Sequence, residues 1–325
     1  MAVDNLRPLL PLAITCGDPA GVGPEVILDW AKTYQGDRSG FAFLGPEVWV
    51  EKLRSVGYEG RGLGFADYEL KPGEPDRQSS LIARDALMKA ARGCVQGRYA
   101  GVVTGPISKE RLRDTGFEHP GQTEYFSEQW GGAPSMSFVG AKLKVILATW
   151  HLSLHDMFHE LSPVSLIQAV TQADQLARVY GSESPRIGVC GLNPHAGENG
   201  LLGGEEQEWI NPLLEDLREK FPGVSSAQPA DTIFWRSLEG EFDVVVALYH
   251  DQGLIPVKTL EFDQAVNVTL GLPYVRTSPD HGTGYSIAGK GKAKSSSFAH
   301  AVRVAQRLVK YRSELGEASN PLDSR

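Results

Sequence analysis

Short apolar runs alternate along the chain with longer segments in which apolar residues recur every three or four positions. Runs of the first kind are typical of strands buried on both faces, and segments of the second kind are typical of amphipathic helices. The runs predict strands at 11–17, 41–45, 101–105, 143–149, 186–192, 242–249 and 265–271. The periodic segments predict helices at 24–34, 80–97, 108–116, 164–181, 204–221 and 295–315.

This alternation of strands and helices predicts an α/β fold whose central strands are largely parallel. In such sheets, ligands bind at the carboxyl ends of the strands. We therefore look for chemistry where the apolar runs stop.

Composition narrows the class of protein. The chain has 325 residues, 41% of them hydrophobic, and a formal net charge of −8. It carries no basic run suited to nucleic acid or anionic membrane and no apolar run of membrane-spanning length. The N-terminal segment, with Asp4 and two prolines, does not resemble a signal peptide. We expect a cytoplasmic protein whose three scattered cysteines are buried, reduced thiols.

Three histidines follow apolar runs directly: His151 ends LKVILATWH, His195 ends RIGVCGLNPH, and His250 ends FDVVVALYH. If these strands are parallel, the three imidazoles lie at one edge of the sheet. Imidazole is a common ligand of zinc, cobalt, nickel and iron, so the pattern predicts a metal site. Asp251 and Asp231 are candidate oxygen ligands. The alternative is three independent, hydrogen-bonded histidines.

Two further histidines, His155 and His159, are spaced four apart from His151 in HLSLHDMFH. The glutamate of a zinc-binding HExxH helix is missing there. We therefore expect His155 and His159 to be surface or capping residues.

Two glycine-containing segments follow predicted strands, GDPAGVGPE at 17–25 and TGPISK at 104–109. Each resembles a loop that cradles phosphate with helix N–H groups. Each is equally typical of a glycine turn needed for packing a strand against a helix.

Polar residues also interrupt apolar surroundings after His250, namely Lys258, Asn267 and Arg276. Isolated charges in such surroundings usually meet a partner, and two cations with an amide suit a phosphate ester or a carboxylate. The glycine-rich segment 279–293 is suited to wrapping an adenosine and its phosphates, or to being a flexible surface loop.

Together these motifs closely resemble the PdxA family of 4-hydroxythreonine-4-phosphate dehydrogenases over almost the whole chain. The matching blocks are GDPAGVGPE, TGPISK, PGQTEYF, LATWHLSL, GLNPHAGE, ADTIF, ALYHDQG, VNVTLGLPYVRTS and DHGTGYSIAGKG. NPHAGE and YHDQG, with the spacing between them, are the most specific.

The resemblance implies a two-domain α/β/α sandwich similar to the isocitrate and isopropylmalate dehydrogenases. We expect the first domain at 1–130 plus 290–325 and the second at 131–289, which carries most ligands. The resemblance also implies a homodimer whose shared active sites lie in the interdomain cleft.

The family's functional residues carry over position by position. Its metal-binding histidines fall on His151, His195 and His250, and its substrate-binding residues fall on Lys258, Asn267, Arg276, Gln122 and Thr123. Gln122 replaces a histidine that is usual in the family, and it cannot carry a positive charge or exchange protons. The loop around His281, Gly282 and Gly289 is similar to the adenosine-binding loop of isopropylmalate dehydrogenases, with Ser286 in place of an aspartate.

The implied reaction belongs to pyridoxal 5′-phosphate (vitamin B6) biosynthesis. The alcohol of 4-hydroxy-L-threonine 4-phosphate is oxidised by NAD or NADP, and the β-keto acid then loses CO2 to give 3-amino-2-oxopropyl phosphate. A zinc, cobalt, magnesium or manganese ion would polarise the reacting oxygen. Asp251 and Asp231 are the candidate general bases or additional ligands.

Three alternatives stay open. A related dehydrogenase could act on 4-phosphoerythronate or another phosphorylated hydroxy acid, which Gln122 leaves possible. A metal-dependent hydrolase would need no nicotinamide. A metal- or phosphate-binding protein would bind ligand without turnover.

Overall fold

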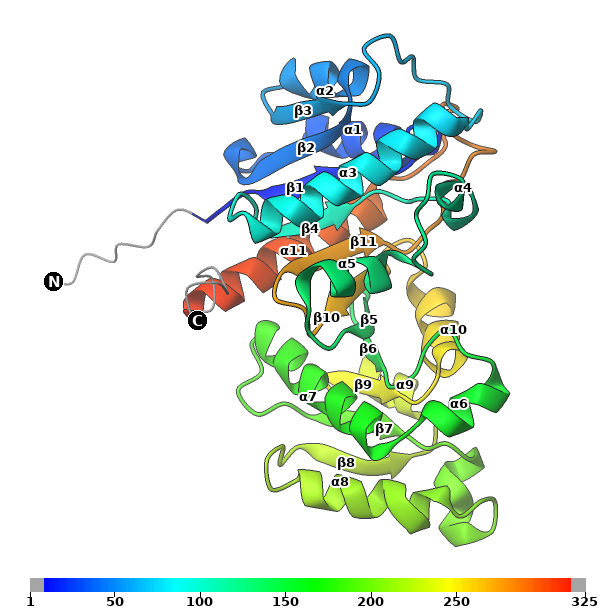
Figure 1. Cartoon of the computed structure of the whole chain (residues 1–325). Coiled ribbons are helices and arrows are strands. Elements are labelled where there is room, and N and C mark those ends of the chain that lie inside the picture. The colour runs from blue at the N-terminus through cyan, green and yellow to red at the C-terminus, as the bar shows by residue number, and fades with distance from the viewer. Residues whose placement is uncertain (1–8, 317–325) are drawn as a thin grey trace, which may run out of the picture. The chain divides into compact units, whose positions relative to one another are not determined.

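The computed structural model describes residues 9–316, so residues 1–8 of the N-terminal segment considered for a signal peptide lie outside it. Within these residues, no helix is both long and apolar enough to cross a bilayer. The chain divides into two compact units, 1–132 with 272–325 and 133–271. Figure 1 shows the elements of each unit.

The described part of unit 1, residues 9–132 and 272–316, contains five strands and six α-helices. The strands are β1 (Leu12–Thr15), β2 (Phe41–Pro46), β3 (Glu59–Leu63), β4 (Gly101–Thr104) and β11 (Val275–Pro279). The helices are α1 (Gly23–Thr33), α2 (Glu47–Arg54), α3 (Arg77–Val95), α4 (Lys109–Arg113), α5 (Gln122–Trp130) and α11 (Ser296–Glu314), with a short 3-10 turn at Arg38–Gly40.

The strands of unit 1 run in the order β3-β2-β1-β4-β11, and every pairing is parallel. Helices α3 and α5 cover one face, where Leu87 and Phe126 pack with Ala13 and Leu44 of the sheet. On the other face, Trp30 of α1 packs edge-on against Phe41 and against Phe298 of α11. An all-parallel sheet of this kind needs apolar cover on both faces, which explains the apolar sequences of β1, β2 and β4; the edge strand β3, EGRGL, is more polar and more exposed.

Unit 2 contains six strands: β5 (Ser135–Val139), β6 (Lys144–Leu147), β7 (Ile187–Cys190), β8 (Val224–Gln228), β9 (Val244–Ala247) and β10 (Val266–Leu270). Its α-helices are α6 (Leu154–Glu160), α7 (Pro163–Val179), α8 (Asn211–Leu217), α9 (Ile233–Leu238) and α10 (His250–Glu261). A turn at Pro194–Gly200 and a π-helix at Glu206–Ile210 complete it.

The strands of unit 2 run in the order β10-β5-β6-β9-β7-β8. The pairs β6–β9, β9–β7 and β7–β8 are parallel, whereas β5 is antiparallel to both neighbours. One face packs against Ile233 of α9 and Leu254 of α10; α7 packs along β9 and β6 (Figure 1). The predicted α/β class is confirmed, and the parallel prediction holds except at β5.

The second boundary between the units differs from the expected one at 289/290. Strand β11 pairs with β4, with Arg276 opposite Val102, so the chain rejoins unit 1 from Leu272 onward. The sequence predicts neither a strand nor a helix for the short segment directly after His250. It forms helix α10, which places Lys258 on a helix, while Asn267 and Arg276 lie on β10 and β11.

Candidate active site

Three histidine-bearing strand ends meet at one edge of unit 2. Strands β6, β9 and β7 are adjacent and parallel, and His151, His250 and His195 follow them in that spatial order. The predicted gathering of these strand ends is therefore present. It arises because each apolar strand stops just before its histidine.

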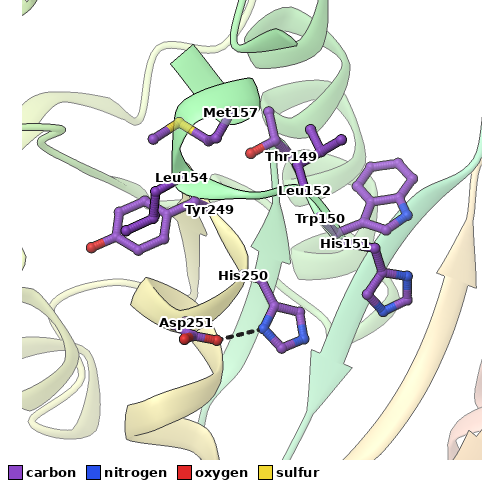
Figure 2. A pocket seen from close by; sticks show the side chains of 9 residues that line it. All are labelled: Thr149, Trp150, His151, Leu152, Leu154, Met157, Tyr249, His250 and Asp251. Atoms are coloured by element: carbon purple, nitrogen blue, oxygen red, sulfur yellow. Dashed lines mark hydrogen bonds and ion pairs between the residues drawn. The ribbon is translucent and has the colours of Figure 1, made fainter. Parts of the chain in front are cut away.

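His151 and His250 border a common pocket, together with Thr149, Tyr249 and Asp251. Their ring centroids are 5.7 Å apart. Figure 2 shows the two imidazoles side by side, with the Asp251 carboxylate against His250. The carboxylate of Asp251 lies 2.7 Å from Nδ1 of His250.

His195 lies on its own turn beyond β7, with Nδ1 2.8 Å from the carboxylate of Glu198. Within residues 9–316, no three His, Cys, Asp or Glu side chains stand close enough together to hold a metal ion. The structure thus brings His151 and His250 together and does not gather His195 with them.

The donor chemistry nevertheless fits a metal. Metal-binding histidines usually give one ring nitrogen to a carboxylate, which orients the ring and leaves the other nitrogen for the ion. Asp251 and Glu198 do this for His250 and His195, so Nε2 of each is the nitrogen left for a ligand. Asp231, the other candidate carboxylate, is exposed just before α9.

The backbone at these strand ends is unusual. Across the described residues, the non-glycine residues with positive φ are His151, His195, Ala196, Glu198 and Asn199. The left-handed region costs a non-glycine residue roughly 1–2 kcal/mol. Such strain persists only where the surroundings enforce it, and it concentrates at functional sites. Two of the three predicted metal ligands carry it.

A buried carboxylate enforces the turn that carries His195. Glu206 is 1% exposed and accepts hydrogen bonds from the backbone N–H groups of Leu192 and Asn193, both at 2.8 Å. The side chain of Asn193 donates to it at 2.9 Å. The sequence does not single out Glu206, because nothing in GEEQEW distinguishes this buried glutamate from the half-buried Glu205 or the exposed Glu208.

In unit 1, Arg276 forms the centre of a buried polar cluster. It is 4% exposed, and its Nη2 donates to Ser278 at 2.9 Å, to Gln122 Oε1 at 3.0 Å and to Thr104 at 3.3 Å. Burial lowers the pKa of Arg276 to about 10, which still leaves it charged at neutral pH. Thr123 is buried beside Gln122 at the start of α5. The predicted pairing of an isolated cation with polar partners is present here.

The loop at 17–25 is a packing turn in this structure. Its N–H groups already have acceptors: Asp18 donates to Pro106, Ala20 to Asp18, and Val22 to Thr283. Gly17 has a φ of +73°, and a Cβ there would lie 2.4 Å from the carbonyl oxygen of Pro106. The sequence left open a phosphate-cradling loop and a glycine turn that packs a strand against a helix. The hydrogen bonds favour the glycine turn.

The same turn holds the predicted cofactor loop. Asp18 accepts from the Tyr285 hydroxyl at 2.7 Å, and Glu25 accepts from the Gly289 N–H at 2.8 Å. His281 Nδ1 lies 3.0 Å from the carbonyl oxygen of the exposed Gly282. The loop is thus fixed at several points and is not a freely flexible segment.

The remaining predictions concern cysteines and surface histidines. The three thiols are free and buried, and burial raises the pKa of each, which argues against a catalytic thiolate. His155 and His159 are exposed on α6 with their rings 5.3 Å apart, as expected of surface residues.

Comparison with known proteins gives matches over most of the chain. The family model described as "Pyridoxal phosphate biosynthetic protein PdxA" matches residues 46–305. A "4-hydroxythreonine-4-phosphate dehydrogenase" from Beijerinckia indica subsp. indica is 41% identical, covering 92% of this chain and 95% of its own. The crystal structure of 4-hydroxythreonine-4-phosphate dehydrogenase from Klebsiella pneumoniae is 34% identical and superposes with a TM-score of 0.78, covering 92% and 99% of the two chains.

A more distant match concerns the fold alone. A β-decarboxylating dehydrogenase from Thermococcus kodakarensis is 14% identical and gives a TM-score of 0.50, covering 95% of this chain and 87% of its own. The expected similarity of fold to that group of dehydrogenases is confirmed.

Proposed function

This chain belongs to the PdxA family of pyridoxal phosphate biosynthetic proteins, and on that premise we propose that it is a 4-hydroxythreonine-4-phosphate dehydrogenase. The reaction oxidises the secondary alcohol with NAD or NADP, and the resulting β-keto acid loses CO2 to give 3-amino-2-oxopropyl phosphate. The observation that carries the proposal is the match over 92% of the chain to relatives with this name.

We assign the divalent ion to His151, His250 and His195, because their strand ends share one edge and two of them have carboxylate partners. When bound, the ion would lower the pKa of the substrate hydroxyl and polarise the carbonyl that forms, while the nicotinamide accepts hydride. Zinc, cobalt, magnesium and manganese all remain in the proposal.

Two carboxylates of the chain, Asp251 and Asp231, have separate roles in this proposal. Asp251 is hydrogen-bonded to His250, so in this structure it orients that ring. Asp231 is exposed and carries no such bond to a histidine among the interactions described, which makes it the better candidate for taking the hydroxyl proton.

Substrate recognition is assigned to Arg276, Lys258, Asn267, Gln122 and Thr123. Arg276 supports the assignment most directly, because a guanidinium held by three polar partners is oriented before an anion arrives. Gln122 takes part in that arrangement as an acceptor, so its amide nitrogen is the group left to donate to a substrate oxygen. The loop carrying His281, Gly282 and Gly289 is assigned to the nucleotide.

We also propose a cytoplasmic homodimer that completes its active sites with residues of both subunits. Light scattering coupled to size-exclusion chromatography measures the number of subunits. Two inactive variants, one altered in His250 and the other in Arg276, test whether each active site contains residues of both subunits. Mixing the two variants restores activity if one site draws on both subunits.

Reduction of NAD or NADP in the presence of 4-hydroxy-L-threonine 4-phosphate tests the proposed reaction. Activity is expected to disappear after chelation and to return with one of the four ions. Hydrolysis without nicotinamide reduction would instead indicate a metal-dependent hydrolase. If only 4-phosphoerythronate is turned over, the protein is a dehydrogenase of the same type with a different substrate. Gln122→His is then the variant that tests whether Gln122 determines the choice of substrate.

A further inference from the structure

The loop at 279–294, most of which the proposed function assigns to the nucleotide, is basic in an acidic chain. It carries three exposed lysines, Lys290, Lys292 and Lys294, and a single acid, Asp280, directly after β11, whereas the whole chain has a formal net charge of −8. NAD and NADP differ by one phosphate group on the 2′ oxygen of the adenosine ribose. The charge beside that ribose therefore decides which of them binds more tightly.

The backbone of the loop is open to a phosphate-bearing ligand. Gly282 and Gly291 are exposed, and a Cβ at either position would meet no atom within 4 Å. Within residues 9–316, their N–H groups donate no hydrogen bond. Backbone N–H groups of a glycine-rich loop, together with a lysine ammonium, are a common donor set for nucleotide phosphates. The donor chemistry of the loop thus fits a nucleotide.

Lys290 places its ammonium group at Ser286. Its Nζ donates to the carbonyl oxygen of Ser286 at 2.8 Å, and an ammonium has three donors, so two remain for a ligand. Ser286 is exposed and takes the place of an aspartate in the similar adenosine-binding loop, so a cation lies here beside a position that is anionic there. An acid in such a site accepts a hydrogen bond from the ribose 2′-hydroxyl, whereas a cation accommodates a 2′-phosphate.

The two carboxylates that contact this loop from the 17–25 turn do not substitute for the missing aspartate. Asp18 is 2% exposed and accepts from the Tyr285 hydroxyl at 2.7 Å. Glu25 Oε2 accepts from the Gly289 N–H at 2.8 Å, and its Oε1 is covered by protein atoms. Both carboxylates hold the loop in place, and neither presents an exposed oxygen to a ribose.

We propose that Lys290 makes this protein select NADP over NAD by pairing with the 2′-phosphate beside Ser286, an inference that rests on the nucleotide assignment of the proposed function. The Ser286 hydroxyl adds a donor to the same phosphate. A 2′-hydroxyl finds no carboxylate at this position, so NAD gains nothing there in return.

Four variants separate the charge of Lys290 from its surroundings. Lys290→Gln removes the charge, Lys290→Arg keeps it, and Ser286→Asp introduces an acid at the serine position. Lys292→Gln is the matched control, because it removes the same charge from an exposed lysine two residues further along the loop. All three positions are exposed, so the melting temperature of each variant is expected to equal that of the wild type.

The test is calorimetric titration of the full-length protein with ADP-ribose and with 2′-phospho-ADP-ribose, which report binding without turnover. We expect the wild type to bind the 2′-phosphorylated ligand about tenfold more tightly, because a hydrogen bond between charged groups is worth at least one decade of affinity. The preference should disappear in Lys290→Gln, persist in Lys290→Arg and Lys292→Gln, and reverse in Ser286→Asp. It should also weaken as salt is added. In turnover, the KM for NADP should rise in Lys290→Gln while kcat stays unchanged.

Other outcomes would overturn the inference. Wild-type protein that binds ADP-ribose as tightly as its 2′-phosphorylated form, or more tightly, does so directly. If Lys290→Gln weakens both ligands by the same factor, Lys290 contacts the pyrophosphate that they share and does not select between them. An equal loss of preference in Lys292→Gln would show that the charge of the whole loop acts, not Lys290. Protein that binds neither ligand would instead overturn the assignment of the loop to the nucleotide in the proposed function.

Discussion

Individual residues in this chain have roles that their neighbours in sequence do not indicate. Glu206 and Glu205 are adjacent, yet Glu206 is 1% exposed and anchors the His195 turn through two backbone N–H groups, while Glu205 is half-buried and accepts a bond from the Asn193 side chain. Arg276 is likewise distinguished from other arginines by its burial among Thr104, Gln122 and Ser278. The identity of a residue limits its chemistry, and its surroundings select which part of that chemistry is used.

Asp243 gives a prediction at this scale. Burial alone would raise the pKa of Asp243, but hydrogen bonds from the guanidinium and N–H of Arg186 and from Ser182 outweigh it, so the pKa is lowered. A carboxyl with a lowered folded pKa contributes stability above its ordinary pKa of about 4, and that contribution is lost as pH falls through the folded value.

Asp243→Asn should therefore reduce the free energy of unfolding at pH 7 by about 2 kcal/mol. The difference from wild type should shrink as the pH is lowered below about 4. Urea titrations between pH 3 and 7 measure both effects. A difference that stays constant over this range would contradict the charged pairing with Arg186.

Elements of this fold place chemistry where regular structure stops. Strand β7 ends at Cys190, and the chain then passes through a turn in which His195 to Asn199 all have positive φ. Turns of this kind are intrinsically unfavourable for non-glycine residues, so the turn depends on the hydrogen bonds that Glu206 accepts from Leu192 and Asn193.

Glu206→Gln tests that dependence. The amide offers one acceptor oxygen in place of two and no charge, so the turn should lose about 2 kcal/mol of stabilisation. Chemical denaturation measures the loss, and cleavage by a protease within 194–200 should accelerate. Glu208→Gln, an exposed neighbour, is the control; equal effects of the two substitutions would show that burial of Glu206 is not what matters.

At the scale of the whole molecule, the predicted metal ligands belong to unit 2 and the Arg276 cluster to unit 1. A ligand that binds only the native state stabilises it by mass action, by about 2.7 kcal/mol at a concentration of 100 times Kd. The stabilisation is expected to be largest in the elements that hold the ion.

Hydrogen exchange with and without Co²⁺ measures this distribution. Amides of 148–152, 191–196 and 248–252 should exchange more slowly with the ion present, whereas β2 and β3 of unit 1 should change little. His151→Ala is the control, because it should remove the effect without altering the fold of unit 1. Uniform slowing across both units would argue against an ion held at the strand ends of unit 2.

The sequence by itself determined the α/β class and the strand-terminal histidines. Short continuous apolar runs between turn residues are typical of strands covered on both faces, and parallel strands bring their carboxyl ends to a common edge. The motifs from GDPAGVGPE to DHGTGYSIAGKG also identified the family, because they occur together and in order.

Only the tertiary structure decided the rest. The apolar residues after His250 suited a strand as well as a helix, and packing of Leu254 and Val257 against β6 and β9 selected α10. The buried hydrogen bonds of Glu206 to Asn193, of Gln252 to Gly191 and of Thr149 to Leu248 join residues that are 13, 61 and 99 positions apart in the sequence. The local pattern of apolar and polar residues indicates which face of a helix or strand is buried. It does not report which distant backbone group a buried polar side chain will meet, because that is fixed only when the strands are in register.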